Sequence, residues 1–539
     1  MKLKLNLLLF LIVFIVSCNG EKNKTITISK DELKDKIAGG WAGKMIGVTY
    51  GAPTEFRALG RTYEDSIKWV PEDVKGSVWQ DDIYVQLTFL MAMDRFGMDA
   101  PAKKYHEMFA KAGYQLWHAN VQARKNYFDS IFPPQSGQPE YNLHADDIDF
   151  QIEADYIGFM CPGMPATASR IADKVGHIMN YGDGVYGGVF VAALYSEAFF
   201  ESDIPKIINQ ALLSIPTESD YAKIVNDVIL LHQQYPSDWR AAWAELEARW
   251  GSEHICEAGS SFNIDAKVNG AFIVMGLLYG GGDPEKTMEV STRCGQDSDC
   301  NPSNAMAVLG VIKGFSGLPA EYQHAINAIG DQDFIHTEYS FNKAVEKTLE
   351  YAGKLTVENG GESNEKELKI KVQQPVTFPL EVSFPDLVFD RKVSVFAKEY
   401  WEQKGNWAND TKAKDPGKLE ETSTASYSGN AGDELSFTFE GTGVSIVGNW
   451  FKDGGKADIY VDDEFKRTID CYFNYANQQH ENMNLYHITN LPEGKHSVRI
   501  VVKGDKRPES EGTNVYISDA VVFKTAGKVS KNFKFSFQK

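Results

Sequence analysis

The chain has 539 residues, of which 43% are hydrophobic and 24% are charged, and its formal net charge is −19. This length and composition are typical of two or three folded domains and exclude a disordered or fibrous chain. An acidic chain repels phosphate backbones, so nucleic acid is excluded as a partner.

Residues 1–23 predict an export signal followed by a short tether. Two lysines precede an apolar run from Leu7 to Val16, and Ser17 and Cys18 follow in a pattern that resembles a bacterial lipobox. The run is shorter than the roughly 20 residues that a spanning helix needs. We expect an exported chain, periplasmic or at the cell surface, attached to a bacterial membrane only by a lipid on Cys18; a retained spanning helix is the alternative.

Residues 24–357 contain long apolar segments of helical length, such as "IYVQLTFLMAMDRFG" and "GGVFVAALYSEAFF", and predict an all-α domain. Near its start, Gly39, Gly43, Gly47 and Gly51 recur every four residues. On a helix they form a ridge without side chains, along which another backbone can approach closely. This glycine ridge favours tight helix packing over direct contact with a ligand.

Two pairs of aspartates stand where apolar helices are expected to begin. Asp81 and Asp82 open one such helix, and Asp297 and Asp299 precede the apolar segment "NAMAVLGVI". Buried carboxylates that lie together repel each other, and they require protons or a cation. Oxygen ligands of this kind favour Mg²⁺, Ca²⁺ or Mn²⁺ over zinc. The alternative interpretation is that these aspartates cap turns and face solvent.

The residues around the second pair restrict this prediction. Asn301 and Pro302 suit an N-cap and a first helical turn, so the helix is expected to start there. The segment from Asp297 begins like an EF-hand loop, but Pro302 replaces the required Gly and Val308 replaces the required Glu, which excludes that motif. The cysteine spacing fits neither a disulfide framework nor a CxxC zinc motif, and a Cys294–Cys300 bridge is left open.

Further polar residues precede other apolar helices and are candidates for substrate binding. His177, Asn180 and Asp183 lie in "GHIMNYGDGVYGG", and Asp149 lies in "HADDIDFQIEADYIG". Polar groups flanked by glycine at a helix start suit ligand hydroxyls or phosphates. A purely structural role for each is the alternative.

The pattern changes after the helical region. Residues 358–394 are expected to be a connector with some β structure, and residues 395–525 contain short alternating strands that predict an antiparallel β-sandwich. A tail, residues 526–539, follows. The sandwich resembles galactose-binding-like and carbohydrate-binding modules; its aromatic residues suit sugar binding or an ordinary core.

Three segments occur in a fixed order: "GGWAGKMIGVTYGAPTEF", "WQDDI" and "GQDSDCNPSNAMAVLG". Together they resemble the ADP-ribosylglycohydrolase family over residues 30–350. The resemblance implies an all-α domain with a binuclear Mg²⁺ site, followed here by a β-sandwich that it does not cover. It matches this chain's residues to the family's metal-site acids as follows: Asp81, Asp82, Asp297, Asp299 and, near the metals, Glu55.

This sequence departs from the family pattern at three positions. Gln80 stands where the family has Thr, Cys300 where it has Thr or Ser, and Val48 where an acid is common. A glutamine carbonyl can still bind a hard cation, whereas a thiol is a poor ligand for Mg²⁺. We therefore include Gln80 among the metal ligands and expect one or two ions, with one site weaker.

The residues and the resemblance together predict a metal-assisted hydrolase of glycosidic bonds with Glu55, Asp82 and Asp297 as catalytic residues. The predicted export and the sandwich favour an extracellular glycan as substrate. One alternative is removal of ADP-ribose from a protein or small molecule. A second is a sugar-binding surface lipoprotein whose catalytic centre has decayed.

Overall fold

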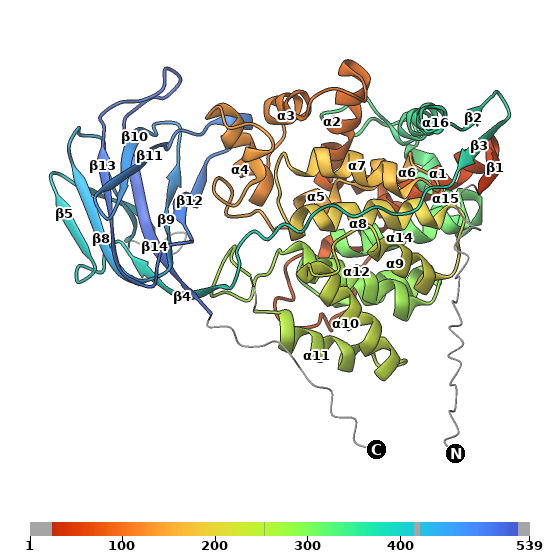
Figure 1. Ribbon diagram of the computed structural model, residues 1–539, viewed down its shortest axis with the longest axis horizontal. Coiled ribbons are helices and arrows are strands. Elements are labelled where there is room, and N and C mark those ends of the chain that lie inside the picture. Colours follow the sequence, from red (N-terminus) through yellow and green to blue (C-terminus); the bar gives the residue numbers. More distant parts are fainter. Residues whose placement is uncertain (1–23, 253, 414–420, 527–539) are drawn as a thin grey trace, which may run out of the picture.

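The computed structural model describes residues 24–252, 254–413 and 421–526, so the expected lipid-attachment residue Cys18 lies outside the described residues. A helical domain is followed by an antiparallel β domain, which confirms the predicted fold class and order (Figure 1). Within the described part of the chain, no helix is long and apolar enough to cross a membrane.

The first half of the helical domain contains α1 (Lys30–Gly51), α2 (Asp81–Phe96), α3 (Ala102–Lys111), α4 (His118–Phe128), α5 (Asp149–Ile152), α6 (Asp155–Phe159), α7 (Pro165–Gly176) and α8 (Asp183–Ala198). The second half contains α9 (Ile204–Leu212), α10 (Asp220–Gln234), α11 (Trp239–Trp250), α12 (Ala266–Gly280), α13 (Pro284–Arg293), α14 (Cys300–Lys313), α15 (Ala320–Ile329) and α16 (Phe341–Glu358). Helices α2, α8, α12 and α14 are buried along most of their length and form the core of this domain.

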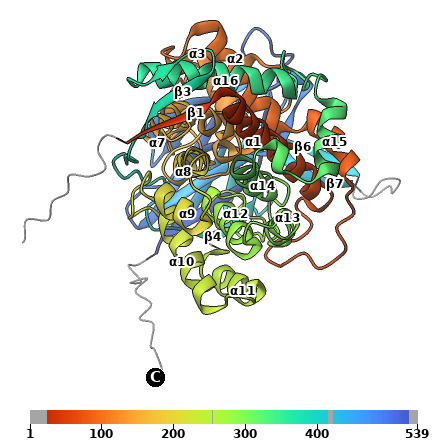
Figure 2. The ribbon, with the colours of Figure 1, turned by 90° about the vertical axis from the view of Figure 1, so that its right-hand side faces the viewer.

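Helices α1 and α14 pack together in the middle of the helical domain (Figure 2). The glycine ridge of α1 makes this possible, because a Cβ atom at Gly43 would lie 2.4 Å from Met306 O and one at Gly47 would lie 2.3 Å from Pro302 O. At the end of α1, a Cβ atom at Gly51 would lie 2.0 Å from Ser298 O. The ridge therefore serves helix packing, as the sequence predicts, and it brings the end of α1 to the start of α14.

A small sheet joins the two ends of the helical domain. Strand β1 (Thr25–Ser29) pairs antiparallel with β3 (Glu367–Lys371), which also pairs with β2 (Glu362–Ser363). The chain then runs without regular structure across the helical domain, past α8 and α5, to the β domain (Figure 1). On this path Tyr186 donates a hydrogen bond to Pro379 O. The range expected to be a connector thus contributes β2 and β3 to the helical domain.

The β domain consists of two antiparallel sheets, consistent with the predicted sandwich. Its strands are β4 (Leu387–Ser394), β5 (Trp401–Lys404), β6 (Ala408–Ala413), β7 (Glu421–Ser428), β8 (Glu434–Gly441), β9 (Gly443–Trp450), β10 (Lys456–Val461), β11 (Glu464–Asp470), β12 (His480–Ile488), β13 (Gly494–Val502) and β14 (Val515–Thr525). One sheet has the order β11-β10-β13-β8-β5, and the other has the order β12-β9-β14-β7-β6, with β4 also paired to β14.

The β domain lies against the helical domain near α4 (Figure 1). The ring of Tyr475 stacks on Phe128 with centroids 3.8 Å apart and planes 7° apart. The side chain of Gln478 accepts a hydrogen bond from Leu116 N at 3.1 Å and donates one to Leu116 O at 2.9 Å. These contacts fix the β domain beside the segment that leads into α4.

Candidate functional site

A cavity of about 410 Å³ opens where the starts of α2, α4 and α14 meet α5 and the segment that follows α1. It is lined by the following residues: Glu55, Phe56, Trp79, Gln80, Asp81, Tyr84, Leu116, Trp117, His118, Asn120, Ile148, Asp149, Ile152, Ile264, Asp297, Asp299 and Cys300. Five of these are acids and none is Lys or Arg. The cavity therefore has a strong excess of negative charge.

One side of the cavity, called here the acidic wall, is formed by the end of α1 and the starts of α2 and α14. The close contact at Gly51 sets its geometry, and Glu55 is the residue that follows the short 3₁₀ helix Ala52–Thr54 after α1. Thr54 Oγ1 and Ser298 Oγ lie 2.8 Å apart in a buried hydrogen bond. These contacts hold Glu55 beside Asp297 and Asp299, so the structure brings the predicted acids together.

The start of α14 differs from the predicted start. Asp299, rather than Asn301, is the N-cap, and its carboxylate accepts a hydrogen bond from Cys300 N at 3.0 Å. The helix begins two residues earlier than expected because Asp299 can satisfy the first backbone N–H itself.

Cys300 is directed at the first acid pair. Its thiol donates to Asp82 Oδ2 at 3.1 Å, while Cys294 Sγ lies 3.9 Å from Met275 Sδ. Both cysteines are free thiols, so the bridge left open by the sequence does not form in this structure.

A buried lysine from α1 holds Asp82 in place. Lys44 Nζ lies 3.0 Å from Asp82 Oδ1 and 3.1 Å from Asp155 Oδ2, and it donates to Ile152 O at 2.9 Å. Burial disfavours its charged form, but Asp155 and Asp82 outweigh this effect and raise the pKa of Lys44. One cation thus compensates part of the negative charge behind the acidic wall.

The surroundings of the remaining acids of this wall disfavour their ionised forms and raise their pKa values. Burial, together with Asp82, raises the pKa of Asp81 to about 6. Burial and Glu55 are among the causes that raise the pKa of Asp297 to about 7. Glu55 is exposed at the cavity mouth, yet loss of surrounding water and the charge of Asp299 raise its pKa to about 8. Carboxyl groups that resist ionisation in this way are suited to bind a cation.

The donor atoms fit a hard divalent cation. One set of ligand atoms within 4.8 Å of one another comes from Glu55, Asp297 and Asp299, and a second comes from Asp82, Asp299 and Cys300. Asp297 Oδ1 is buried and has no hydrogen-bond partner within the described part of the chain. A buried carboxylate oxygen without a partner, close to other carboxylates, can be stabilised by binding Mg²⁺ or Ca²⁺.

Two more predicted ligands stand at the start of α2. Asp81 is the first residue of α2 and lines the cavity. Gln80 is the N-cap of α2 and also lines the cavity, and its side chain makes no capping hydrogen bond. Both therefore face the same cavity as the acidic wall, but Asp81 belongs to neither of the two sets of ligand atoms described above.

The opposite side of the cavity, called here the loop wall, comes from α4, α5 and the segments beside them. Asp149 belongs to this wall, but its carboxylate accepts hydrogen bonds from Ala119 N and Asn120 N and so caps α4. Burial and then Asp147 raise the pKa of Asp149 to about 8. Trp117 and His118 complete the wall.

The three other predicted substrate-binding residues lie outside the cavity lining. His177 Nε2 lies 3.1 Å from a carboxylate oxygen of Glu381 on the chain between β3 and β4. Asn180 donates to Ala145 O and Asp147 O, and Asp183 accepts a hydrogen bond from Tyr221 N. The contacts of Asn180 position the segment that carries Asp147.

Sequence reasoning missed four residues of this site: Lys44, Trp79, Trp117 and His118. A lysine among glycines and apolar residues on a buried helix was a signal for Lys44, since a buried cation needs an acidic partner. Trp79 precedes the first acid pair by two residues and is 66% exposed. No local pattern indicated Trp117 or His118, because their place depends on tertiary structure.

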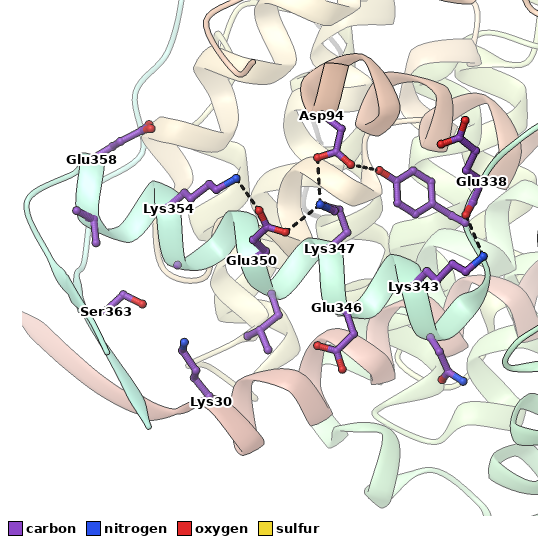
Figure 3. Close-up of a pocket in the computed structure, with 15 residues that line it drawn as sticks. Lys30, Asp94, Glu338, Lys343, Glu346, Lys347, Glu350, Lys354, Glu358 and Ser363 are labelled. Carbon is purple, nitrogen blue, oxygen red and sulfur yellow. Dashed lines mark hydrogen bonds and ion pairs between the residues drawn. The ribbon is translucent and has the colours of Figure 1, made fainter. Parts of the chain in front are cut away.

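A larger groove of about 1150 Å³ runs along α16 (Figure 3). Its charged side chains pair with one another: Lys347 lies 3.2 Å from Asp94 and 2.9 Å from Glu350, which also pairs with Lys354. The groove shares no lining residue with the cavity of about 410 Å³ that contains the acidic wall. Most charged side chains of the groove already form ion pairs with each other. The cavity with the acidic wall is therefore the candidate active site.

The family model for ADP-ribosylglycohydrolase matches residues 29–352, which is more than half of the chain. The chain therefore belongs to the ADP-ribosylglycohydrolase family, and the resemblance seen in the sequence is confirmed. The matched range covers α1 to most of α16 and includes every acid of the cavity.

Individual relatives share less with this chain. An "A type blood N-acetyl-alpha-D-galactosamine deacetylase" from Flavonifractor plautii is 28% identical over 198 residues, which are 35% of this chain and 23% of that protein. A solved "ADP-ribosylglycohydrolase-related protein complex" is 15% identical over 60% of this chain and 98% of its own, with a TM-score of 0.38. The CBM36-1 domain of a multidomain xylanase from the hindgut metagenome of Trinervitermes trinervoides is 17% identical over 25% of this chain and 98% of its own, with a TM-score of 0.17.

Proposed function

We propose that this chain is an exported, metal-assisted hydrolase of glycosidic bonds that acts on an extracellular glycan. The proposal depends mainly on the cavity in the domain that matches the family. Its lining contains Glu55, Asp81, Asp297 and Asp299 and no Lys or Arg. Within it, Asp297 Oδ1 has no hydrogen-bond partner among the described residues. Such a site has the charge and ligand types that a divalent cation requires.

The cation would be held by the aspartates of both acid pairs, with Gln80 as a further oxygen ligand. When bound, Mg²⁺ or a similar ion would supply positive charge that orients a substrate hydroxyl or a water molecule. The thiol of Cys300 donates to Asp82, and a neutral thiol is a poor ligand for such an ion. One well-formed site and a weaker second one follow from this set.

The protein's own groups then have separable roles. Glu55 stands at the cavity mouth, where its carboxylate can accept a proton from an attacking water once it is ionised. Asp297 is buried, and its Oδ1, unpartnered among the described residues, is available to the cation. Lys44 keeps Asp82 in place through its ion pair, so the orientation of that carboxylate does not depend on substrate.

The proposed substrate class depends on the cavity rim and on the predicted export. Trp79 and Trp117 are 66% and 46% exposed, and both line the cavity. Exposed indole rings can stack on sugar faces. The deacetylase relative is named for a sugar substrate, N-acetyl-α-D-galactosamine, although this chain spans only 23% of it. A lipid on Cys18 would hold the enzyme at a bacterial membrane, facing glycans outside the cytoplasm.

Release of ADP-ribose from a protein or small molecule is the second candidate, and membership of the ADP-ribosylglycohydrolase family favours it. The same carboxylates and cation would serve that reaction, because it also cleaves a bond at a sugar C1 atom. The tryptophans do not separate the two candidates, since an adenine ring also stacks on indole.

A substrate panel separates these functions. The purified chain is assayed against aryl α- and β-glycosides and against ADP-ribosyl-arginine, each with and without EDTA, and with Mg²⁺ restored. We expect cleavage of at least one aryl glycoside, its loss in EDTA and its recovery with Mg²⁺. Cleavage of ADP-ribosyl-arginine alone would support the second candidate, and no cleavage with retained glycan binding would support a decayed enzyme.

A further inference from the structure

A second cluster of ligand-type side chains lies in the loop wall. His118 begins α4, His144 and Asp147 precede α5, and Cys256 lies between α11 and α12. One ligand atom from each lies within 4.8 Å of the other three. His144 Nδ1 is 2.8 Å from Asp147 Oδ2 and 3.1 Å from Cys256 Sγ, and His118 Nδ1 is 3.8 Å from Asp147 Oδ2.

The donor set differs in kind from that of the acidic wall. Two imidazole nitrogens, one thiol and one carboxylate match the ligands of Zn²⁺, whereas Mg²⁺ and Ca²⁺ take oxygen ligands. Around a tetrahedral Zn²⁺, neighbouring ligand atoms lie about 3.3–3.8 Å apart, as bond lengths of about 2.0–2.3 Å require. The separation of 3.8 Å lies in this range, and those of 2.8 and 3.1 Å are shorter, so the hydrogen-bonded atoms would move apart by about 0.5 Å to admit the ion.

The backbone already holds Asp147 in place, and both Asp147 and Cys256 are buried. Asp147 is 1% exposed, its carbonyl accepts a hydrogen bond from Asn180 Nδ2 at 2.8 Å, and it forms an antiparallel bridge with Asp265. Cys256 is 3% exposed. A carboxylate and a thiol that are both removed from water are stabilised by a cation between them.

We propose that His118, His144, Asp147 and Cys256 form a structural, four-coordinate Zn²⁺ site that holds the loop wall of the cavity together. Binding releases the Cys256 thiol proton to solvent and uses neutral imidazoles and an ionised carboxylate. The metal joins three segments that are far apart in the chain. None of the four residues belongs to the acid pairs, so this site is independent of the proposed function.

The packing explains why this wall needs such a crosslink. Beside it lies a small cluster of five buried residues, separate from the large core of the helices and shared with the start of α14 through Cys300: Ile148, Ile152, Cys256, Ile264 and Cys300. The ring of Phe262 stacks on His118 with centroids 5.5 Å apart, and His118 lines the cavity. A metal at His118 and Cys256 would fix this aromatic pair at the substrate side of the wall.

The test measures Zn²⁺ directly on the full chain. Chelator-treated protein is titrated with Zn²⁺ against a competing chelator, and with Co²⁺, whose thiolate charge-transfer absorption reports a Co–S bond. We expect one Zn²⁺ per chain, a thiolate band with Co²⁺, and affinity lowered on the order of 100-fold or more in Cys256→Ser and in His144→Gln. Asp297→Asn should retain the Zn²⁺.

The matched control is Cys471→Ser, which removes another buried thiol, in the β domain, and should leave Zn²⁺ affinity unchanged. If Cys256→Ser does not fold, the Co²⁺ spectrum of the unaltered protein still decides. Absence of Zn²⁺ binding, absence of the thiolate band, or equal affinity in Cys256→Ser and Cys471→Ser would overturn the site and leave a hydrogen-bonded cluster.

Discussion

The two walls of the cavity are built by different physical means. The acidic wall stands at the ends of closely packed helices, where the contact between Gly51 and Ser298 fixes Glu55 beside Asp299. The loop wall comes from segments far apart in the chain, and its buried residues form only a small core that it shares with the start of α14. The acidic wall carries the acids proposed for chemistry, whereas the loop wall carries Trp117, which is proposed to bind substrate. Loops can vary such groups without loss of the fold.

The largest expected effect is on turnover and concerns the acidic wall. Glu55→Gln should lower kcat by about 10²–10⁴-fold, the usual contribution of a general base, and leave the fold intact. Steady-state kinetics and circular dichroism check this, with the exposed Glu72→Gln as control. An unchanged kcat would remove Glu55 from the mechanism.

The second largest effect is on the stability of the fold and concerns the buried lysine behind the acidic wall. Lys44→Met should lower the free energy of unfolding by about 3–5 kcal/mol, because it leaves Asp82 and Asp155 buried without their cation. The control is Lys343→Met, whose exposed pair with Asp333 should contribute about 0–1 kcal/mol. Equal denaturant midpoints for the two variants would show that Lys44 does not support the acidic wall.

A smaller loss of stability should follow from damage to the glycine ridge. In Gly47→Val the Cβ atom would lie 2.3 Å from Pro302 O, and backbone cannot move aside as a side chain can. The free energy of unfolding should fall by about 3 kcal/mol. Gly76→Ala, whose Cβ atom would be 3.8 Å from Thr49 Cγ2, is the control and should be near neutral. A similar stability for both variants contradicts the packing argument.

The smallest effect concerns the loop wall. Trp117→Ala should raise KM about fivefold with little change in kcat, since stacking on a sugar ring contributes about 1 kcal/mol. The control is Phe465→Ala, an exposed aromatic residue of the β domain. A fall in kcat with unchanged KM would instead place Trp117 in the chemistry.

The sequence was sufficient to predict the acidic wall because its groups occupy helix starts. Asp81 and Asp82 begin an apolar helix, and the glycine ridge of α1 packs on the helix that follows Asp297. The start of α14 was misplaced because the carboxylate of Asp299 caps the helix two residues before Asn301, the cap that the sequence suggested.

The loop wall could not be predicted in this way. His118 and Cys256 are separated by more than a hundred residues, and only the folded chain brings them together. For the same reason His177 and Asp183, which precede an apolar helix as the acids do, were expected in the cavity but lie outside its lining. A polar residue at a helix start is therefore a candidate for a functional site. The packing of the helices determines which helix starts lie together in one cavity.

The central claim is that the acidic wall binds a divalent cation required for hydrolysis, and calorimetric titration of Mg²⁺ into metal-free protein tests it most directly. Without metal, the raised pKa values of Asp81 and Asp297 make the native state bind more protons than the unfolded chain, so stability falls as pH rises from about 4 to about 7. Bound Mg²⁺ replaces those protons, so its affinity should rise over the same range. The account predicts Mg²⁺ binding that restores activity and that is strongly weakened, together with activity, in Asp297→Asn. No titratable divalent cation, with full activity after exhaustive EDTA treatment, would contradict it.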